Sequence, residues 1–345
     1  MPLHPTTCRK VQAAVGKSRV EVRGVAPAMN LQAVGGCSAA YQNLRTSVTV
    51  RITLIANPRD PDRVVQVREQ VKILRSAGHE VSPLLTFEQG DGEWMTRRAA
   101  EDGADLIIAA GGDGTLNEVA NGIVRFVDEG GQSVPRLAIV PFGTANDLAA
   151  TLGIPDEIEA AIQIAVGEMV MEVDTGMVDG RVFLNVSTGG IGAEATEETS
   201  SESKRSLGTL SYMVTGVRKF VALTVCTARF TCGEDEIYDG PFLLFAIGNS
   251  IRTGGGNLLT PRASMHDGLL DLCIVKESSR IEFLRLLPEL RSGQHLDHPS
   301  VIYRQLPGVR VESPVELSVN ADGEPLEGRT FRYGIGTHRL KLMVP

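Results

Sequence analysis

The first part of the chain alternates short apolar runs with segments whose apolar residues recur at helical spacing. Residues 48–56 and 81–86 are runs rich in branched side chains, which are typical of strands. Between them, apolar residues recur from Val64 to Leu74, and this spacing predicts a helix that ends at Gly78. The further strands and helices predicted in the same way are 93–102, 106–110, 137–140 and 158–165. Strands that alternate with helices predict a parallel sheet with right-handed crossovers.

After about Glu168 the pattern changes to short β-rich runs. The predicted strands are 182–186, 225–231, 242–247, 269–275, 309–311 and 315–319. Turn signals separate them, among them Asp179-Gly180 and Asp239-Gly240-Pro241. Helical spacing returns only at residues 207–221 and 281–290. This half therefore predicts a mainly antiparallel β domain.

The apolar run at 106–110 ends abruptly in the turn Gly111-Gly112-Asp113-Gly114. Thr115 and Glu118 then have the spacing of a capping box at the start of a helix. A strand, a glycine turn and a helix N-terminus form an anion site, because free amides and the helix dipole point at the turn. Asp113 would repel an anion unless a cation lies between them, so we expect a nucleotide phosphate with Mg²⁺. A plain strand-to-helix turn is the alternative for this stretch alone.

Composition adds few constraints. With 345 residues the chain is long enough for two domains, and 42% apolar and 22% charged residues are ordinary for a globular protein. The net charge of −8 gives no overall attraction to nucleic acid, so we expect no nucleic-acid partner. No apolar run has the length that spans a bilayer. The five cysteines are scattered without zinc-ligand spacing, which indicates reduced thiols in a cytosolic protein.

Residues 1–47 differ from the rest of the chain. They include six lysines and arginines but only one acidic residue, Glu21, and their apolar residues do not recur with a sustained period. The composition favours a disordered tail. A basic targeting leader and a gene start assigned too early, with Met29 as the true initiator, remain open.

The stretch GGDGTLNE, residues 111–118, resembles the GGDGT-x-NE signature of the diacylglycerol-kinase catalytic-domain family. Residues 141–147 resemble the P-x-G-T-x-N-D loop of that family, and residues 247–272 are most similar to the bacterial YegS-like lipid kinases. The resemblance runs from about Val48 to the C-terminus. It implies a Rossmann-like nucleotide-binding α/β domain at 48–172, a β-sandwich-like lipid-substrate domain at 173–332, and a return of 333–345 to the first domain.

The resemblance implies an ATP site at the carboxyl ends of the parallel strands, where ligands of open α/β sheets bind. The candidate nucleotide-binding residues are Asn57, Thr86, Gly111, Gly112, Asp113, Gly114, Thr115, Leu116, Asn117, Glu118, Gly143, Thr144 and Asn146. Asp113 would also hold Mg²⁺. After Asn57 the family has a small residue and a glycine, whereas this chain has Arg59-Asp60-Pro61. Pro61 has no amide to donate, so a backbone contact to phosphate there is left open.

Residues 320–324 contain the candidate catalytic carboxylates. By local rules Asp322-Gly323 is a hairpin turn after an alternating strand. The resemblance to the D-G-E motif of the family implies that the glutamate accepts the proton. We therefore expect Glu324 to be the base and Asp322 its partner or a metal carboxylate, with the reverse order still possible. Two neighbouring carboxylates raise the pKa of one another, which would help one act near neutral pH.

A second Mg²⁺ site is implied at residues 264–269. There Asp267 would bind the ion together with the main-chain carbonyls of Ser264 and Leu269, an oxygen set that suits Mg²⁺. This site would be structural or regulatory. A simple Asp267-Gly268 turn remains the alternative.

The helix predicted at 207–221 has an apolar face flanked by Lys204, Arg205, Arg218 and Lys219. A basic amphipathic helix can lie on a membrane, so we expect transient membrane-surface contact, although packing on its own domain is the simpler alternative. The family resemblance implies a cytoplasmic enzyme peripheral to the inner face of the membrane. The oligomeric state, monomer or dimer, stays open.

Together these features predict an ATP-dependent, Mg²⁺-dependent lipid kinase that phosphorylates a hydroxyl of diacylglycerol, phosphatidylglycerol or a related lipid. An NAD kinase, which shares the GGDG turn, is the alternative enzyme. A nucleotide-binding regulator with an inactive site is the non-enzymatic alternative, and the altered loop after Asn57 supports it.

Overall fold

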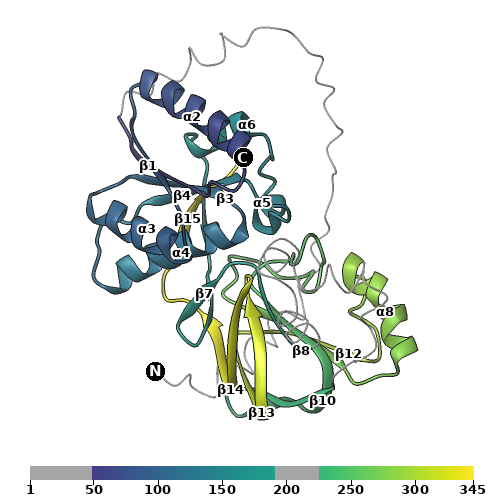
Figure 1. Cartoon of the computed structure of the whole chain (residues 1–345). Helices are drawn as coiled ribbons and strands as arrows, with labels where there is room; N and C mark the ends of the chain where they lie inside the picture. Colours follow the sequence, from purple (N-terminus) through teal and green to yellow (C-terminus); the bar gives the residue numbers. More distant parts are fainter. Residues whose placement is uncertain (1–48, 191–224) are drawn as a thin grey trace.

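The structure is a computed structural model that describes residues 49–190 and 225–345. The predicted leader and the helix predicted at 207–221, with its four flanking basic residues, lie outside the described residues. The described chain forms a parallel sheet with helices, followed by an antiparallel sheet that carries one helix (Figure 1). The predicted fold class is confirmed.

The first sheet has the strand order β2-β1-β3-β4-β15-β5, and β5 is antiparallel to its neighbour while the other pairs are parallel. Its strands are β1 (Arg51–Ala56), β2 (Glu80–Leu85), β3 (Leu106–Gly111), β4 (Arg136–Pro141), β5 (Val170–Val173) and β15 (Leu340–Met343). Helices α2 (Pro61–Ser76) and α6 (Ile158–Ala165) cover one face, and α3 (Asp91–Glu101) and α4 (Asp113–Asp128) cover the other (Figure 1). The short α5 (Asp147–Leu152) follows β4.

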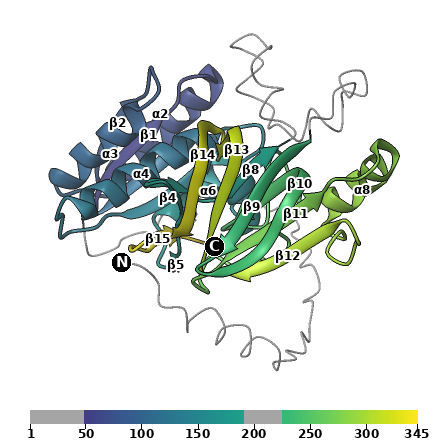
Figure 2. The same cartoon turned by 90° about the horizontal axis from the view of Figure 1, so that it is seen from below.

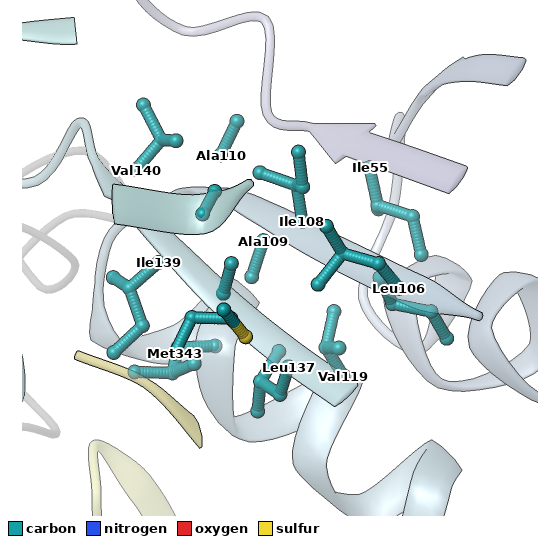
Figure 3. Packing of buried hydrophobic residues seen from close by; sticks show 14 of the residues in the cluster. Ile55, Leu106, Ile108, Ala109, Ala110, Val119, Leu137, Ile139, Val140 and Met343 are labelled. Atoms are coloured by element: carbon teal, nitrogen blue, oxygen red, sulfur yellow. The ribbon is translucent and has the colours of Figure 1, made fainter. Parts of the chain in front are cut away.

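The core of this domain centres on β3, whose six residues are all buried. Figure 3 shows Leu106 and Ile108 of β3 beside Leu137 of β4, Val119 of α4 and Met343 of β15. Each large side chain buried in this way contributes roughly 1.5–3 kcal/mol. The packing fixes the carboxyl ends of β3 and β4, from which the two glycine loops extend.

The second sheet has the order β12-β11-β10-β8-β13-β14-β6-β7, with β9 paired to β10 and β13. Its strands are β6 (Gly176–Val178), β7 (Arg181–Phe183), β8 (Val186–Gly190), β9 (Cys226–Cys232), β10 (Asp235–Gly248), β11 (Leu270–Lys276), β12 (Val301–Leu306), β13 (Gly308–Ala321) and β14 (Glu324–Ile335). Phe230, Phe242 and Phe245 pack edge to face in its main core, with centroids 5.3–5.7 Å apart. Helix α8 (Arg280–Ser292) packs on a separate apolar cluster through Phe283, Leu286 and Leu290.

Some local predictions in the β domain were wrong. Asp239-Gly240-Pro241 is no turn but lies inside the long strand β10. Strand β10 pairs with β9 from Asp235 to Phe242, with a register shift between Glu236 and Tyr238, and its second half pairs with β8 and β11. The predicted strands 309–311 and 315–319 are one strand, β13, with an irregular step after Glu312. The Asp179-Gly180 turn is confirmed, since both residues have positive φ between β6 and β7.

Candidate functional site

Two glycine loops touch at the carboxyl ends of β3 and β4. A Cβ atom on Gly143 would lie 2.8 Å from the Cα of Gly112, and one on Gly112 would lie 3.2 Å from the Cα of Gly143. The amide of Phe142 also donates to the carbonyl of Gly111 at 2.8 Å. Neither loop can therefore carry a larger residue at the contact without moving the other.

Helix α4 begins at Asp113, with Gly112 as an N-cap that makes no side-chain cap. The predicted Thr115–Glu118 capping box is thus wrong, because the N-cap is Gly112, three residues before Thr115. Thr115 is instead buried against Gly111. With no side chain across its N-terminus, α4 offers its first amides and its dipole to an anion.

Asp113 is partly buried at this helix start. Burial, and next the charge of Asp147, raise the pKa of the Asp113 carboxyl. The amide of Leu148 approaches one carboxylate oxygen at 3.5 Å. A partly buried carboxylate that is repelled by another acid is stabilised by a bound cation, so the residues at this site fit Mg²⁺.

No group of three or more His, Cys, Asp or Glu side chains converges on a metal position within residues 49–190 and 225–345. Mg²⁺ at a nucleotide site commonly uses only one or two carboxylates, with water and phosphate completing its shell. The residues present therefore suit a cation that arrives with a nucleotide.

Asp147 joins the two domains. Its carboxylate is buried and accepts hydrogen bonds from the amides of Gly255 at 3.0 Å and Gly256 at 2.8 Å. These glycines have φ of +81° and +100°, a backbone conformation that side chains rarely allow. Asn146 acts within its own loop, where it accepts from the amide of Gly143 and donates to the Gly143 carbonyl, both at 2.8 Å. The sequence motif placed Asp147 in the P-x-G-T-x-N-D loop, but it did not predict the contact with Gly255 and Gly256.

Asp322 lies at the tip of the β13–β14 hairpin with φ of +50°. Its carboxylate accepts hydrogen bonds from the amide of Leu184 at 2.5 Å, the amide of Asn185 at 3.0 Å and Nδ2 of Asn117 at 3.2 Å. Burial raises the pKa of Asp322 to about 6, and the charge of Asp113 adds to the rise. The hairpin tip is thereby tied to helix α4 and brought next to Asp113.

Glu324, two residues further on, is partly buried and faces the first domain. Nε2 of Gln89 donates to Oε2 of Glu324 at 2.5 Å. Gln89 lies in the loop from β2 to α3, and the loop is fixed by two acidic residues. Asp91 accepts from the amides of Phe87 and Glu88, while Glu118 accepts from the amides of Gly90 at 3.1 Å and Gly92 at 2.8 Å. Gln89 was not predicted, since nothing in its local sequence marks it.

Leu116, Asn117 and Glu118 of the GGDGT-x-NE stretch contact other parts of the protein. Leu116 is buried in the core, and Nδ2 of Asn117 donates to the carbonyl of Val182 at 2.9 Å as well as to Asp322. Asn117 and Glu118 therefore hold neighbouring segments in place around the glycine turn, since Glu118 binds the amides of Gly90 and Gly92. Gly114 is exposed, with nothing within 4 Å of a Cβ placed on it. Thr144 is also exposed, in the loop after Gly143.

Asn57 and Thr86 lie at the carboxyl ends of β1 and β2, on the same sheet edge as the glycine turn. The amide of Asn57 donates to Ala110 and that of Thr86 to Ala56, each at 3.0 Å. The unusual Asp60-Pro61 pair starts α2. Asp60 is the N-cap, and its carboxylate accepts from the amides of Asp62 and Arg63 at 3.1 Å. A side chain thus occupies amides that would otherwise face an anion.

The loop around Asp267 is the second candidate metal position. Oδ1 of Asp267 accepts from the amide of Leu269 at 3.0 Å, as in an Asp-Gly turn, and burial raises the pKa of Asp267. Ser264 Oγ lies within hydrogen-bond distance of the His266 ring. Asp174 fixes the loop by accepting from the amide of Gly268 at 2.8 Å and pairing with Arg339 at 2.7 Å. Carboxylate and main-chain carbonyl oxygens are the ligands of hard cations, so the residue types of this turn fit one.

The comparisons with known proteins agree with this architecture. Residues 51–178 match the family model described as "Diacylglycerol kinase catalytic domain". Residues 185–343 match the family model described as "YegS C-terminal NAD kinase beta sandwich-like domain". "Probable lipid kinase YegS-like" of Pseudomonas aeruginosa UCBPP-PA14 is 36% identical over 280 residues, 81% of this chain and 90% of the relative. "Probable lipid kinase YegS" of Salmonella heidelberg SL476 is 35% identical over 295 residues, 85% and 95% of the two chains.

A solved structure is similar over the same extent. A provisionally named diacylglycerol kinase of Bacillus anthracis str. Sterne superimposes with a TM-score of 0.74 at 25% identity, covering 86% of this chain and 95% of that chain. Within the described residues, no helix has the length and apolar character needed to span a membrane. The family predicted from the sequence motifs is confirmed: the chain belongs to the YegS-like lipid kinases, which carry a diacylglycerol kinase catalytic domain.

Proposed function

We propose that the protein transfers the γ-phosphoryl group of ATP to a hydroxyl of a membrane lipid. One observation carries the proposal: the Asn117–Asp322 hydrogen bond brings the hairpin with Glu324 to the helix that begins at Asp113. The proposed anion site, the proposed cation-binding carboxylate and the proposed base would thus lie at one junction. Phosphoryl transfer needs these three groups in proximity.

In this proposal the amides at the start of α4 and the loops at Gly112 and Gly143 bind the phosphates. Asp113 would hold Mg²⁺ against the phosphate oxygens. Mg²⁺, when bound, neutralises phosphate charge and so favours attack at the γ-phosphorus. Asp267, with the carbonyls of Ser264 and Leu269, would hold a second, structural Mg²⁺.

Glu324 is the proposed base. The hydrogen bond from Gln89 orients one of its carboxylate oxygens, and the other can accept the proton of the lipid hydroxyl. The lipid oxygen then forms a bond to the γ-phosphorus while the bond to the bridging oxygen of ADP breaks. Asp322 is less suited to accept the proton, because protein donors already occupy its oxygens. Its role is to position the hairpin.

The acceptor class follows from the family, in which relatives are named lipid kinases. Diacylglycerol, phosphatidylglycerol and related lipids are the proposed acceptors. Since ATP and Mg²⁺ are cytosolic and the acceptor is in a bilayer, we propose a cytoplasmic enzyme that works at the inner face of the membrane.

The test is incubation with γ-labelled ATP, Mg²⁺ and a bacterial lipid extract, with NAD⁺ as a parallel acceptor. A labelled lipid that is absent with Asp113→Asn and Glu324→Gln is expected. Label on NAD⁺ instead would make the protein an NAD kinase. Thermal protection by ATP without transfer to any acceptor would indicate an inactive nucleotide-binding regulator.

A further inference from the structure

Helix α8 has one buried face and one exposed face of unusual composition. Phe283, Leu286 and Leu290 on the inner face are at most 1% exposed. We define the outer face as the six exposed residues that follow helical spacing on the other side, namely Arg280, Ile281, Leu284, Arg285, Pro288 and Arg291. Ile281 is 65% exposed and Leu284 47%. Large aliphatic side chains therefore stand in solvent between arginines.

The outer face is positively charged although the whole chain has a net charge of −8. Its three arginines make no ion pair and no side-chain hydrogen bond with the part of the chain that the structure describes. The neighbouring Glu282 is partly buried and accepts a hydrogen bond from the Ser300 hydroxyl at 2.8 Å. The three arginines are exposed, whereas the two glutamates of the helix, Glu282 and Glu289, are only partly exposed, so the outer face favours an anionic partner.

The position of α8 leaves this face accessible. In both views the helix lies at the side of the second sheet away from the first domain (Figures 1 and 2). Its C-terminal end rests on the loop that reaches the nucleotide domain. The amide of Leu258 donates to the carbonyl of Arg291 at 3.3 Å, and His295 Nε2 lies 3.1 Å from the Leu259 carbonyl. The same loop carries Gly255 and Gly256, which bind Asp147 beside Asp113.

We propose that the outer face of α8 docks on an anionic lipid bilayer. Arginines beside exposed aliphatic residues on one helix face are the composition of interfacial helices, whose apolar side chains enter the headgroup region. A nucleic acid would engage the arginines but offer no apolar contact to Ile281 and Leu284. A second copy of the same face would bring like charges together. The inference rests on the proposed function in that the acceptor lipid resides in a bilayer.

The binding test compares the full-length protein with phosphatidylcholine vesicles and with vesicles that also contain phosphatidylglycerol. The Arg280→Glu/Arg285→Glu variant is expected to sediment with anionic vesicles at least about 25-fold more weakly, since each arginine near such a surface contributes roughly fivefold and each glutamate adds repulsion. Leu284→Asp should also weaken binding. The matched controls are Arg329→Glu/Arg332→Glu, two exposed arginines of β14, and Val315→Asp, which is 59% exposed on β13. Both controls should bind like the parent protein.

Equal vesicle binding by the α8 variants and the parent protein would overturn the inference. An equal loss of vesicle binding in the β14 control would also overturn it, because the overall charge of the protein would then explain the binding. Loss of RNA binding with unchanged vesicle binding would assign the face to nucleic acid. A short-chain acceptor in solution separates this inference from the proposed function. The α8 variants should phosphorylate it normally but lose activity on vesicles. If no acceptor is phosphorylated while vesicle binding still depends on α8, the docking surface stands and the proposed function fails.

Discussion

Gln89 in the first domain donates its side-chain amide to the carboxylate of Glu324 in the second, with 2.5 Å between Nε2 and Oε2. The donor loop is held by Glu118, a residue of the glycine-rich motif, through the amides of Gly90 and Gly92. Glu118 of the motif thus holds the loop whose residue Gln89 contacts the candidate base Glu324. The orientation of Glu324 depends on how the two domains meet.

Gln89→Ala should lower kcat about tenfold or more and leave KM for ATP nearly unchanged, because a hydrogen bond to a charged group is worth roughly 1.5–3 kcal/mol. Steady-state kinetics with saturating lipid measure both constants. If Gln89 acts only through Glu324, adding Gln89→Ala to Glu324→Gln should cause no further loss. Additive losses in the double variant would show that Gln89 has a separate role.

Asp147→Ala should destabilise the protein by about 3 kcal/mol, because two hydrogen bonds between a buried carboxylate and the Gly255 and Gly256 amides are lost. Urea unfolding gives the free energy of unfolding. Asp128→Ala is the control, since this exposed residue makes only a surface pair with His338 and should cost less than about 1 kcal/mol. Equal losses in the two variants would contradict the docking role of Asp147.

Gly143→Ala should lower the melting temperature and weaken ATP binding, because its Cβ would lie 2.8 Å from the Cα of Gly112. Gly114→Ala is the steric control. A Cβ at Gly114 meets nothing within 4 Å, and alanine in the helix stabilises by up to about 1 kcal/mol. Calorimetry should give a lower melting temperature for the first variant and an equal or higher one for the second. A stable Gly143→Ala protein with normal ATP affinity would mean that the two loops need not touch.

Asp322 should make the protein less stable as pH rises from about 4 to 7. Its pKa is raised from 3.8 to about 6, so the folded state binds more protons than the unfolded state within this window. The stability contributed by the protonated carboxyl is present below about pH 4 and is lost as pH rises through 6. The difference is about 2–3 kcal/mol. Urea unfolding across this range should show a shallower pH slope for Asp322→Asn, and identical slopes would contradict the assignment.

The sequence predicted the features that depend on local pattern. The fully apolar run of β3 and the glycine turn after it were enough to indicate a parallel sheet with an anion site. The capping box was wrong because Glu118 accepts hydrogen bonds from the amides of Gly90 and Gly92 instead. The sequence around Glu118 does not reveal these distant donors. The turn predicted at Asp239 is wrong because residues 239–241 pair with β9 inside β10, and a local turn signal does not reveal that pairing.

The contacts between the domains could not be predicted from local patterns. Asn117 and Asp322 are 205 positions apart, and Gln89 and Glu324 are 235 apart. Asparagine and glutamine are common on protein surfaces, so neither residue type marks a site by itself. Only the fold brings these side chains to the junction between the sheets.

The central claim is that Glu324 removes the proton of the acceptor hydroxyl at the site where Asp113 and the glycine loops bind ATP. Single-turnover transfer of labelled phosphate with Glu324→Gln, at saturating ATP and lipid, tests it most directly. The account predicts ATP affinity within about twofold of the parent protein and a transfer rate lowered about 100-fold or more, the usual contribution of a general base. Transfer at the parental rate by Glu324→Gln would contradict it.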